Sequence, residues 1–241
     1  TMDYAGRREE FCRQMAEQEL DAYLVLARPN VRYLSGFTGE DTTLLVTANR
    51  TVLVTDSRYT EQAAEETDVE EIFSRQGPMC AALANLCKKL GIERLGCTAG
   101  SIYLATWAEL TGALESTEAR ALKNGIAEGM RVCKDADEVE AIRRALELGQ
   151  QVLADFLPEV LPGRTERWLA ARLEFEMREA GAEGPSFPTI CAVGPSASKP
   201  HAVTSERMVK QHSPVMFDWG VQLHGYCSDL TRVVAIGRIP R

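Results

Sequence analysis

The sequence predicts an α/β protein whose first half contains a mixed sheet, and three patterns support that fold class. Short apolar runs at 22–26 and 51–55 are rich in β-branched residues and have the length of buried strands. Longer stretches between such runs, beginning with 7–20, carry apolar residues at helical spacing. Residues 43–47 and 51–55 flank a short polar turn and form a hairpin. Strands that alternate with helices indicate an α/β layer. Because the two hairpin strands pair antiparallel, its sheet is expected to be mixed.

The other elements of the first half follow from local signals. Pro78 near the start and Gly91 just past the end delimit one helix. Gly36 stops a helical turn, because glycine readily adopts the left-handed conformation that ends helices. We therefore expect helices at 7–20, 57–66, 78–90 and 101–114, a helical turn at 30–36, and strands at 22–26, 43–47, 51–55, 69–73 and 95–97.

A boundary is predicted near Asn124-Gly125, which divides the chain into domains 1–125 and 126–241. After it, Asp135 with Glu138 three residues later is a capping-box pattern that starts a new helix. That helix is expected to run to Phe156, with a second one from 165 to 181. A strand at 187–193, a loop at 194–200 and a hairpin at 215–236 complete the second half.

Composition excludes several classes of function. The net charge of −8 argues against a nucleic-acid partner or an anionic membrane surface. No apolar run approaches the length of a membrane span, and the N-terminus has no signal-peptide pattern. The seven cysteines are scattered, with no Cys-x-x-Cys pair, which is typical of reduced thiols. We therefore expect a cytoplasmic protein.

The hairpin at 215–236 is the stretch with the clearest chemical content. If His224 and Gly225 are its turn residues, Leu223 lies opposite Tyr226. The same register places Asp218 opposite Thr231, with Asp229 as the diagonal neighbour of Asp218 on one face. Diagonal neighbours are about 7–8 Å apart at Cα, so their side chains can converge.

Two interpretations of Asp218 and Asp229 remain open on spacing alone. Either they are solvated residues on the polar face of an ordinary hairpin, or they bind metal or take part in catalysis. The second is favoured by their position within apolar strands, because a buried carboxylate is costly unless it is paired or metal-bound. His201, which follows the loop 194–200, is by itself better explained as an ordinary loop histidine.

Segments throughout the chain resemble the pita-bread metallopeptidases, which are the prolidases and Xaa-Pro aminopeptidases, with creatinase as a relative that uses no metal. The resemblance rests on Phe217-Asp218-Trp219-Gly220, on Gly225 to Arg232, and on Phe187 through His201. Residues 32–39 and 55–59 are similar to the N-terminal domain of the prolidase and creatinase group. Asp56 and Arg58 in the latter segment are better explained as fixing a strand end than as touching substrate.

This resemblance implies a creatinase-like N-terminal α/β domain followed by the first half of a pita-bread α+β catalytic domain. It implies two divalent metal ions, of which Mn²⁺ suits carboxylate ligands best and Co²⁺ or Zn²⁺ can substitute. Asp218 would chelate one ion and Asp229 would bridge both, while His201 would hydrogen-bond the substrate or the tetrahedral intermediate. Thr231, opposite Asp218 in our register, is a candidate hydrogen-bond partner of that ligand. A proline-containing peptide substrate and a homodimer are the implied partners.

The family completes its metal site with a His and two Glu downstream of this hairpin, and the sequence stops at Arg241 soon after it. Two carboxylates are too few for a two-metal centre. We therefore expect the 241 residues to be the N-terminal portion of a peptidase and to be inactive alone. We also expect apolar surface to be exposed where the second half would pack, which favours self-association or the capture of a partner.

Two alternatives remain. A creatinase-like amidinohydrolase would use the same fold without metal, although retention of both Asp218 and Asp229 counts against it. A non-catalytic binding or scaffold protein would keep the fold and lose the chemistry. A His and two Glu after residue 241 would favour the peptidase, and their absence would favour the scaffold.

Overall fold

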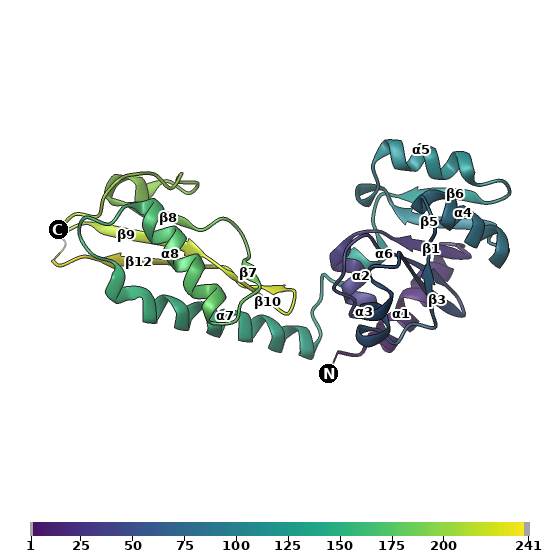
Figure 1. Cartoon of the computed structure of the whole chain (residues 1–241), viewed down its shortest axis with the longest axis horizontal. Coiled ribbons are helices and arrows are strands. Elements are labelled where there is room, and N and C mark those ends of the chain that lie inside the picture. Colours follow the sequence, from purple (N-terminus) through teal and green to yellow (C-terminus); the bar gives the residue numbers. More distant parts are fainter. Residues whose placement is uncertain (1, 239–241) are drawn as a thin grey trace. The chain divides into compact units, whose positions relative to one another are not determined.

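The structure is a computed structural model that describes residues 2–238 and divides the chain into two compact units, Thr1–Cys133 and Lys134–Arg241 (Figure 1). The division falls eight residues after the predicted boundary at 125. The reason is α6 (Ile126–Met130), which buries Ile126 and Ala127 in the core of the first unit. No helix among residues 2–238 is long and apolar enough to cross a membrane.

The first unit is an α/β domain built on a six-stranded sheet of order β4-β3-β2-β1-β5-β6. Neighbours β1, β2 and β3 pair antiparallel, whereas β1–β5, β3–β4 and β5–β6 pair parallel, so the predicted mixed sheet is confirmed. In chain order the elements are α1 (Tyr4–Glu17), β1 (Ala22–Val25), α2 (Arg28–Ser35), β2 (Thr43–Thr47), β3 (Arg50–Thr55), α3 (Thr60–Glu66), β4 (Glu71–Ser74), α4 (Met79–Leu90), β5 (Arg94–Thr98), η1 (Ala99–Ser101), α5 (Leu104–Ala113), β6 (Glu118–Leu122) and α6.

Side chains that alternate along the strands pack into two separate hydrophobic cores, one on each face of the sheet. Tyr23 and Val25 of β1 pack on one face with α1, α2 and α6, whereas Ala22 and Leu24 pack on the other face with α4 and α5. This division follows from the two-residue period of a strand. Gly36, with φ of 79°, ends α2 in the left-handed conformation as predicted.

The second unit packs two helices against two small three-stranded antiparallel sheets (Figure 1). Asp135 and Glu138 form the predicted capping box at the start of its long helix. Trp219, fully buried, donates from Nε1 to the carbonyl of Gly149 at 3.0 Å and so ties the sheet to that helix. In chain order the elements are α7 (Ala136–Phe156), η2 (Leu157–Glu159), α8 (Glu166–Glu179), β7 (Gly184–Pro185), β8 (Ile190–Val193), η3 (Gly194–Ser198), β9 (Pro214–Trp219), β10 (Val221–Leu223), β11 (Tyr226–Cys227) and β12 (Leu230–Ala235).

The predicted hairpin register is confirmed at both ends. Leu223 pairs with Tyr226, and Asp218 pairs with Thr231. His224 and Gly225 form the turn, with φ of 47° and 72°, as expected of a tight hairpin turn. The hairpin differs from the prediction in being shared between two sheets, one ordered β12-β9-β8 and the other β11-β10-β7.

The strand predicted at 187–193 is shorter in the structure, where β8 begins at Ile190. Pro188 lies in the predicted part that is not a strand. Because proline has no N–H to donate to a ladder, a strand is disfavoured there.

Candidate active site

Asp218 lies on β9 in a row of side chains that crosses all three strands of the β12-β9-β8 sheet. Ile190 of β8 is its partner on one side and Thr231 of β12 on the other. The Thr231 hydroxyl donates to Asp218 Oδ1 at 3.0 Å. The carboxylate is half-buried, so this hydrogen bond both satisfies one oxygen and limits the side chain's rotation.

The hairpin is kinked between Asp218 and Asp229. Val221 N–H donates to the Ser228 hydroxyl at 3.0 Å, while the Ser228 carbonyl accepts from the Ser186 hydroxyl at 2.7 Å. A Cβ on Gly220 would lie 1.8 Å from that carbonyl oxygen, so only glycine fits at the kink. The interruption separates the ladder of β9 and β12 from that of β10 and β11.

Asp229 lies between β11 and β12 and is exposed, whereas its neighbours Ser228 and Leu230 are buried towards Gly149 of α7. Since successive side chains alternate in direction, Asp229 points to the side away from the helices. Thr231 and its partner Asp218 belong to that same side. The fold therefore gives the two carboxylates one common face of the hairpin.

His201 lies in a turn after η3 and is exposed. The next residue, Ala202, is buried in a small cluster with Ala192 of β8 and Met216 of β9. Met216 precedes Asp218 by two residues, so both face the same way. The loop that carries His201 thus lies over the face of the sheet that carries Asp218.

Residues around Glu166 anchor this loop, and sequence reasoning did not single them out. Glu166, in the first turn of α8, is fully buried and accepts hydrogen bonds from Val193 and Ser205. An acidic residue in the first turn of a helix is common, because it interacts favourably with the helix dipole. The sequence therefore offered no signal that this carboxylate is buried. Burial, with Glu166 nearby as a second cause, raises the pKa of the Cys191 thiol to about 12.

The ion pairs of Asp56 and Arg58 fix the end of β3. Asp56 accepts from the Arg58 backbone N–H at 3.0 Å and from its guanidinium at 2.7 Å, which holds the pKa of Asp56 far below its usual range. Arg58 also donates to Asp41 at 2.9 Å. These contacts fit the structural role expected from the sequence.

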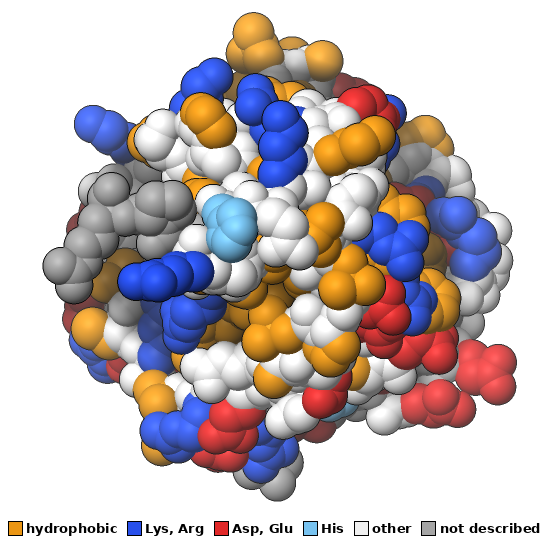
Figure 2. Space-filling view, turned by 90° about the vertical axis from the view of Figure 1, so that its left-hand side faces the viewer, with side chains coloured by type: hydrophobic (Ala, Val, Ile, Leu, Met, Phe, Trp, Pro, Cys, Tyr) orange, Lys and Arg blue, Asp and Glu red, His pale blue; other side chains and the backbone are white. Residues whose placement is uncertain are grey.

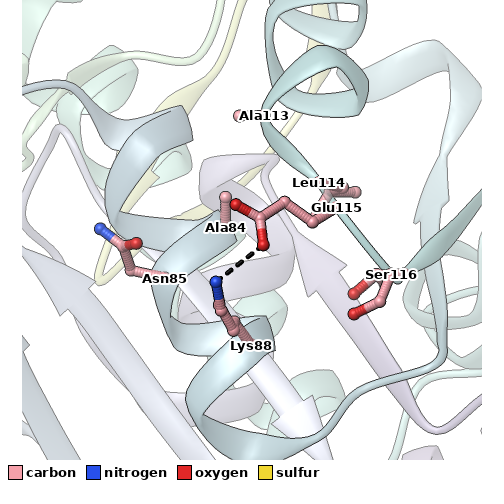
Figure 3. A pocket seen from close by; sticks show the side chains of 8 residues that line it. Ala84, Asn85, Lys88, Ala113, Leu114, Glu115 and Ser116 are labelled. Carbon is pink, nitrogen blue, oxygen red and sulfur yellow. Dashed lines mark hydrogen bonds and ion pairs between the residues drawn. The ribbon is translucent and has the colours of Figure 1, made fainter.

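A shallow pocket between α4 and the turn before β6 is unrelated to these residues. It encloses about 50 Å³, and an ion pair of 2.7 Å between Lys88 and Glu115 lies across it (Figure 3). Pockets for small ligands are roughly 300–1,000 Å³, so this one is too small for a peptide.

The donor set on the hairpin fits a divalent cation in kind, since Asp218 and Asp229 offer hard carboxylate oxygens. It falls short in number: residues 2–238 contain no group of three or more His, Cys, Asp or Glu side chains placed to hold a metal ion. The two carboxylates thus fit one part of a coordination sphere.

The carboxylate face also carries exposed apolar side chains. Val233, in the row of Met216 and Ala192, is 64% exposed, and Val203, after Ala202, is 85% exposed. At the end of the second unit, hydrophobic side chains lie in the middle of the visible surface, with both basic and acidic side chains around them (Figure 2). This unit therefore leaves apolar surface uncovered.

Comparison with known proteins gives matches over nearly all of the chain. Residues 7–133 match the Creatinase/Prolidase N-terminal domain, and residues 140–241 match Metallopeptidase family M24. An uncharacterized peptidase of Bacillus subtilis, YqhT, is 32% identical over 91% of this chain and 62% of its own length.

Two solved structures share the fold. A Xaa-Pro dipeptidase from Bacillus anthracis superposes with a TM-score of 0.93 at 29% identity, over 99% of this chain and 66% of that one. An X-Pro aminopeptidase from Thermotoga maritima gives 0.88 at 32% identity, over 94% and 66%. The chain thus spans a little under two thirds of the length of these relatives.

Proposed function

Because this chain belongs to the creatinase/prolidase proteins, with their N-terminal domain at residues 7–133 and a match to metallopeptidase family M24 at 140–241, we propose that it forms the larger part of a metal-dependent Xaa-Pro peptidase. The substrate class is an Xaa-Pro dipeptide or a longer peptide with proline in its second position. Support comes from the Xaa-Pro dipeptidase and X-Pro aminopeptidase that share its fold.

The observation that carries the proposal is the common face of Asp218 and Asp229. A strand that is otherwise apolar holds Asp218 half-buried and fixes it by the Thr231 hydroxyl. Such an arrangement is suitable for a ligand whose direction must be set.

In this proposal Asp218 and Asp229 would supply carboxylate ligands to the divalent ions, with Mn²⁺ as the ion. A metal pair supplies a water of lowered pKa and polarises the scissile carbonyl. Thr231 keeps one oxygen of Asp218 occupied and orients the other. The proposal takes the further ligands from outside residues 2–238, in which no group of three or more His, Cys, Asp or Glu side chains is placed to hold a metal ion.

His201 would hydrogen-bond the substrate. Its ring N–H would donate to the carbonyl oxygen of the scissile Xaa-Pro bond and would stabilise the negative charge that forms on that oxygen in the tetrahedral intermediate. Exposure of His201 on its loop leaves the ring accessible to a peptide. The neighbouring Val203 and the proline ring of a substrate are both apolar.

The proposal also includes a homodimer in the cytoplasm. The free thiols of all seven cysteines suit a reducing compartment. Residues 1–241 by themselves are proposed to be inactive and prone to self-association through the apolar face of the second unit.

The test is peptide hydrolysis by the complete natural protein. Xaa-Pro dipeptides and tripeptides are incubated with the protein after chelation and after Mn²⁺ is restored, with Xaa-Ala peptides as controls. Cleavage of the Xaa-Pro bond that disappears with chelator and returns with Mn²⁺ supports the proposal. Absence of metal-dependent cleavage of any Xaa-Pro peptide contradicts it, and creatine turnover in the presence of chelator would support a creatinase-like enzyme instead.

A further inference from the structure

Glu166 has no part in the chemistry proposed above, yet it is a fully buried carboxylate. A buried carboxylate is costly unless hydrogen bonds replace its water. Glu166 Oε1 accepts from Val193 N–H at 2.7 Å, and Oε2 accepts from Ser205 N–H at 2.9 Å and from the Ser205 hydroxyl at 2.6 Å. Both oxygens are thus occupied by donors from outside α8.

The two donors lie on either side of His201 in the chain. Val193 is the last residue of β8, directly before η3, and Ser205 follows His201 by four residues. A single carboxylate therefore joins the two ends of the segment 194–204. Three hydrogen bonds to one buried carboxylate thus close the loop.

Other contacts support the same closure. Arg167 N–H donates to the Ser205 carbonyl at 3.0 Å, and Glu166 N–H donates to the Arg207 carbonyl at 2.9 Å. Cys191 N–H donates to the Thr204 hydroxyl at 3.1 Å. Residues 204–207 are therefore held both to β8 and to the start of α8. The Arg207 guanidinium, half exposed at 4.0 Å from Glu166, adds little.

We propose that Glu166 is a positioning residue for His201: it closes the loop 194–204 and so holds His201 over the sheet face that carries Asp218. This rests on the proposed function for the role of His201, whereas the closure itself does not depend on it. Ala202, which follows His201 in the chain, is buried against Met216 and so attaches the loop to the sheet. Both acceptor oxygens are required, since each of them accepts a hydrogen bond. The amide of Glu166→Gln offers one oxygen and turns an NH₂ group towards a donor.

Amide hydrogen exchange and NMR of the 241-residue chain test the closure. In Glu166→Gln we expect the Val193 and Ser205 amides to exchange about tenfold faster, the equivalent of about 1.4 kcal/mol. The His201 ring resonances should shift. Ser205→Ala should give a smaller effect of the same kind. The matched control is Glu174→Gln on the same helix, whose carboxylate accepts from Thr189 N–H at 3.2 Å and not from the loop.

The proposal is overturned if Glu166→Gln leaves the Val193 and Ser205 amides and the His201 resonances as in the wild type. It is equally overturned if exchange rises uniformly through the second unit, because that outcome is general destabilisation. Should Glu166→Gln not fold, Ser205→Ala decides: faster exchange confined to residues 193–205 supports the closure, and unchanged exchange there contradicts it.

Kinetics of the complete natural protein test the consequence for His201. Glu166→Gln should lower kcat with little change in KM, and its effect should be much smaller in a His201→Ala background. Full additivity of the two effects would contradict positioning through His201. If the wild type cleaves no Xaa-Pro peptide, the proposed function fails, while the exchange result still reports on the loop.

Discussion

At the scale of single residues, the site depends on a polar residue placed where the strand would otherwise be apolar. Asp218 lies between the fully buried Phe217 and Trp219, whose side chains face the helices. Its own side chain points the other way, and the Thr231 hydroxyl offsets part of the desolvation of its carboxylate. Thr231 should therefore matter to any ligand that Asp218 binds.

Replacing Thr231 by valine keeps the shape and the β-branch while removing the hydroxyl. Because groups that orient a metal ligand commonly affect affinity or activity by about 10–100-fold, we expect Thr231→Val to lower kcat/KM for an Xaa-Pro peptide by that factor in the complete protein. Thr231→Ser, which retains the hydroxyl, is the control and should stay within a few-fold of the wild type. Equal activity of the valine variant would show that the hydrogen bond has no role.

At the scale of secondary-structure elements, the kink in the hairpin determines how Asp229 is presented. Gly220 has no room for a side chain because the Ser228 carbonyl and the Ser186 hydroxyl occupy the place of a Cβ. The same contacts join β7 to the hairpin, since Ser186 N–H also donates to the Gly220 carbonyl at 3.0 Å. A change at Gly220 should therefore disturb the packing around the two carboxylates.

We expect Gly220→Ala to destabilise the second unit by about 1–3 kcal/mol, the usual cost of forcing an extra group into a packed site. Gly112→Ala in α5 is the matched control, because no atom lies within 4 Å of its added Cβ. An alanine there should be neutral or stabilise the helix by about 0.5–1 kcal/mol. Thermal unfolding of both variants measures the difference, and an unaffected Gly220→Ala protein would mean that the kink is absent.

The pairing of β1 with β5 carries a pH-dependent contribution to stability. Arg94 donates to Asp21 from its backbone at 2.8 Å and from its guanidinium at 2.8 Å, and the guanidinium is the main reason that the pKa of Asp21 is lowered. A carboxyl with a lowered folded pKa stabilises the fold above its ordinary pKa of 3.8. That contribution is lost as pH falls through the lower folded pKa.

Asp21→Asn should accordingly lower the free energy of unfolding at pH 7 by about 1 kcal/mol, a modest figure because solvent screens this partly exposed pair. The difference from the wild type should vanish in acid, once Asp21 is protonated in both the folded and unfolded states. Denaturant unfolding at a series of pH values measures it. A difference that stays constant from neutral to acidic pH would exclude ionisation of Asp21 as its source.

The sequence predicts well what local chemistry decides. The turn at His224-Gly225 sets the register of Asp218 with Thr231, and the capping box at Asp135 starts α7; both are confirmed. It does not predict what depends on distant partners. Glu166 meets its donors only through the fold, and the kink needs Ser186, which lies far from Gly220 in the chain. The units divide after Cys133 and not after residue 125 for the same reason, because Ile126 packs in one core with residues of α1 and β1.

At the scale of the whole molecule, the chain combines an α/β unit that has two complete cores with a second unit that leaves one sheet face partly uncovered. The uncovered face carries both carboxylates and the loop of His201. The chain covers 66% of the length of each of two relatives of known structure, and the match to metallopeptidase family M24 spans residues 140–241. We therefore propose that the divalent ions bind at this face of the second unit.

Mn²⁺ binding to the complete natural protein, followed by electron paramagnetic resonance, tests the central claim most directly. The comparison is between the wild type, Asp218→Asn, Asp229→Asn and the control Asp155→Asn, whose carboxylate lies on the exposed side of α7. We predict two bound ions in the wild type and in Asp155→Asn, with loss of at least one ion in each hairpin variant. Unchanged Mn²⁺ binding in both hairpin variants would contradict the account.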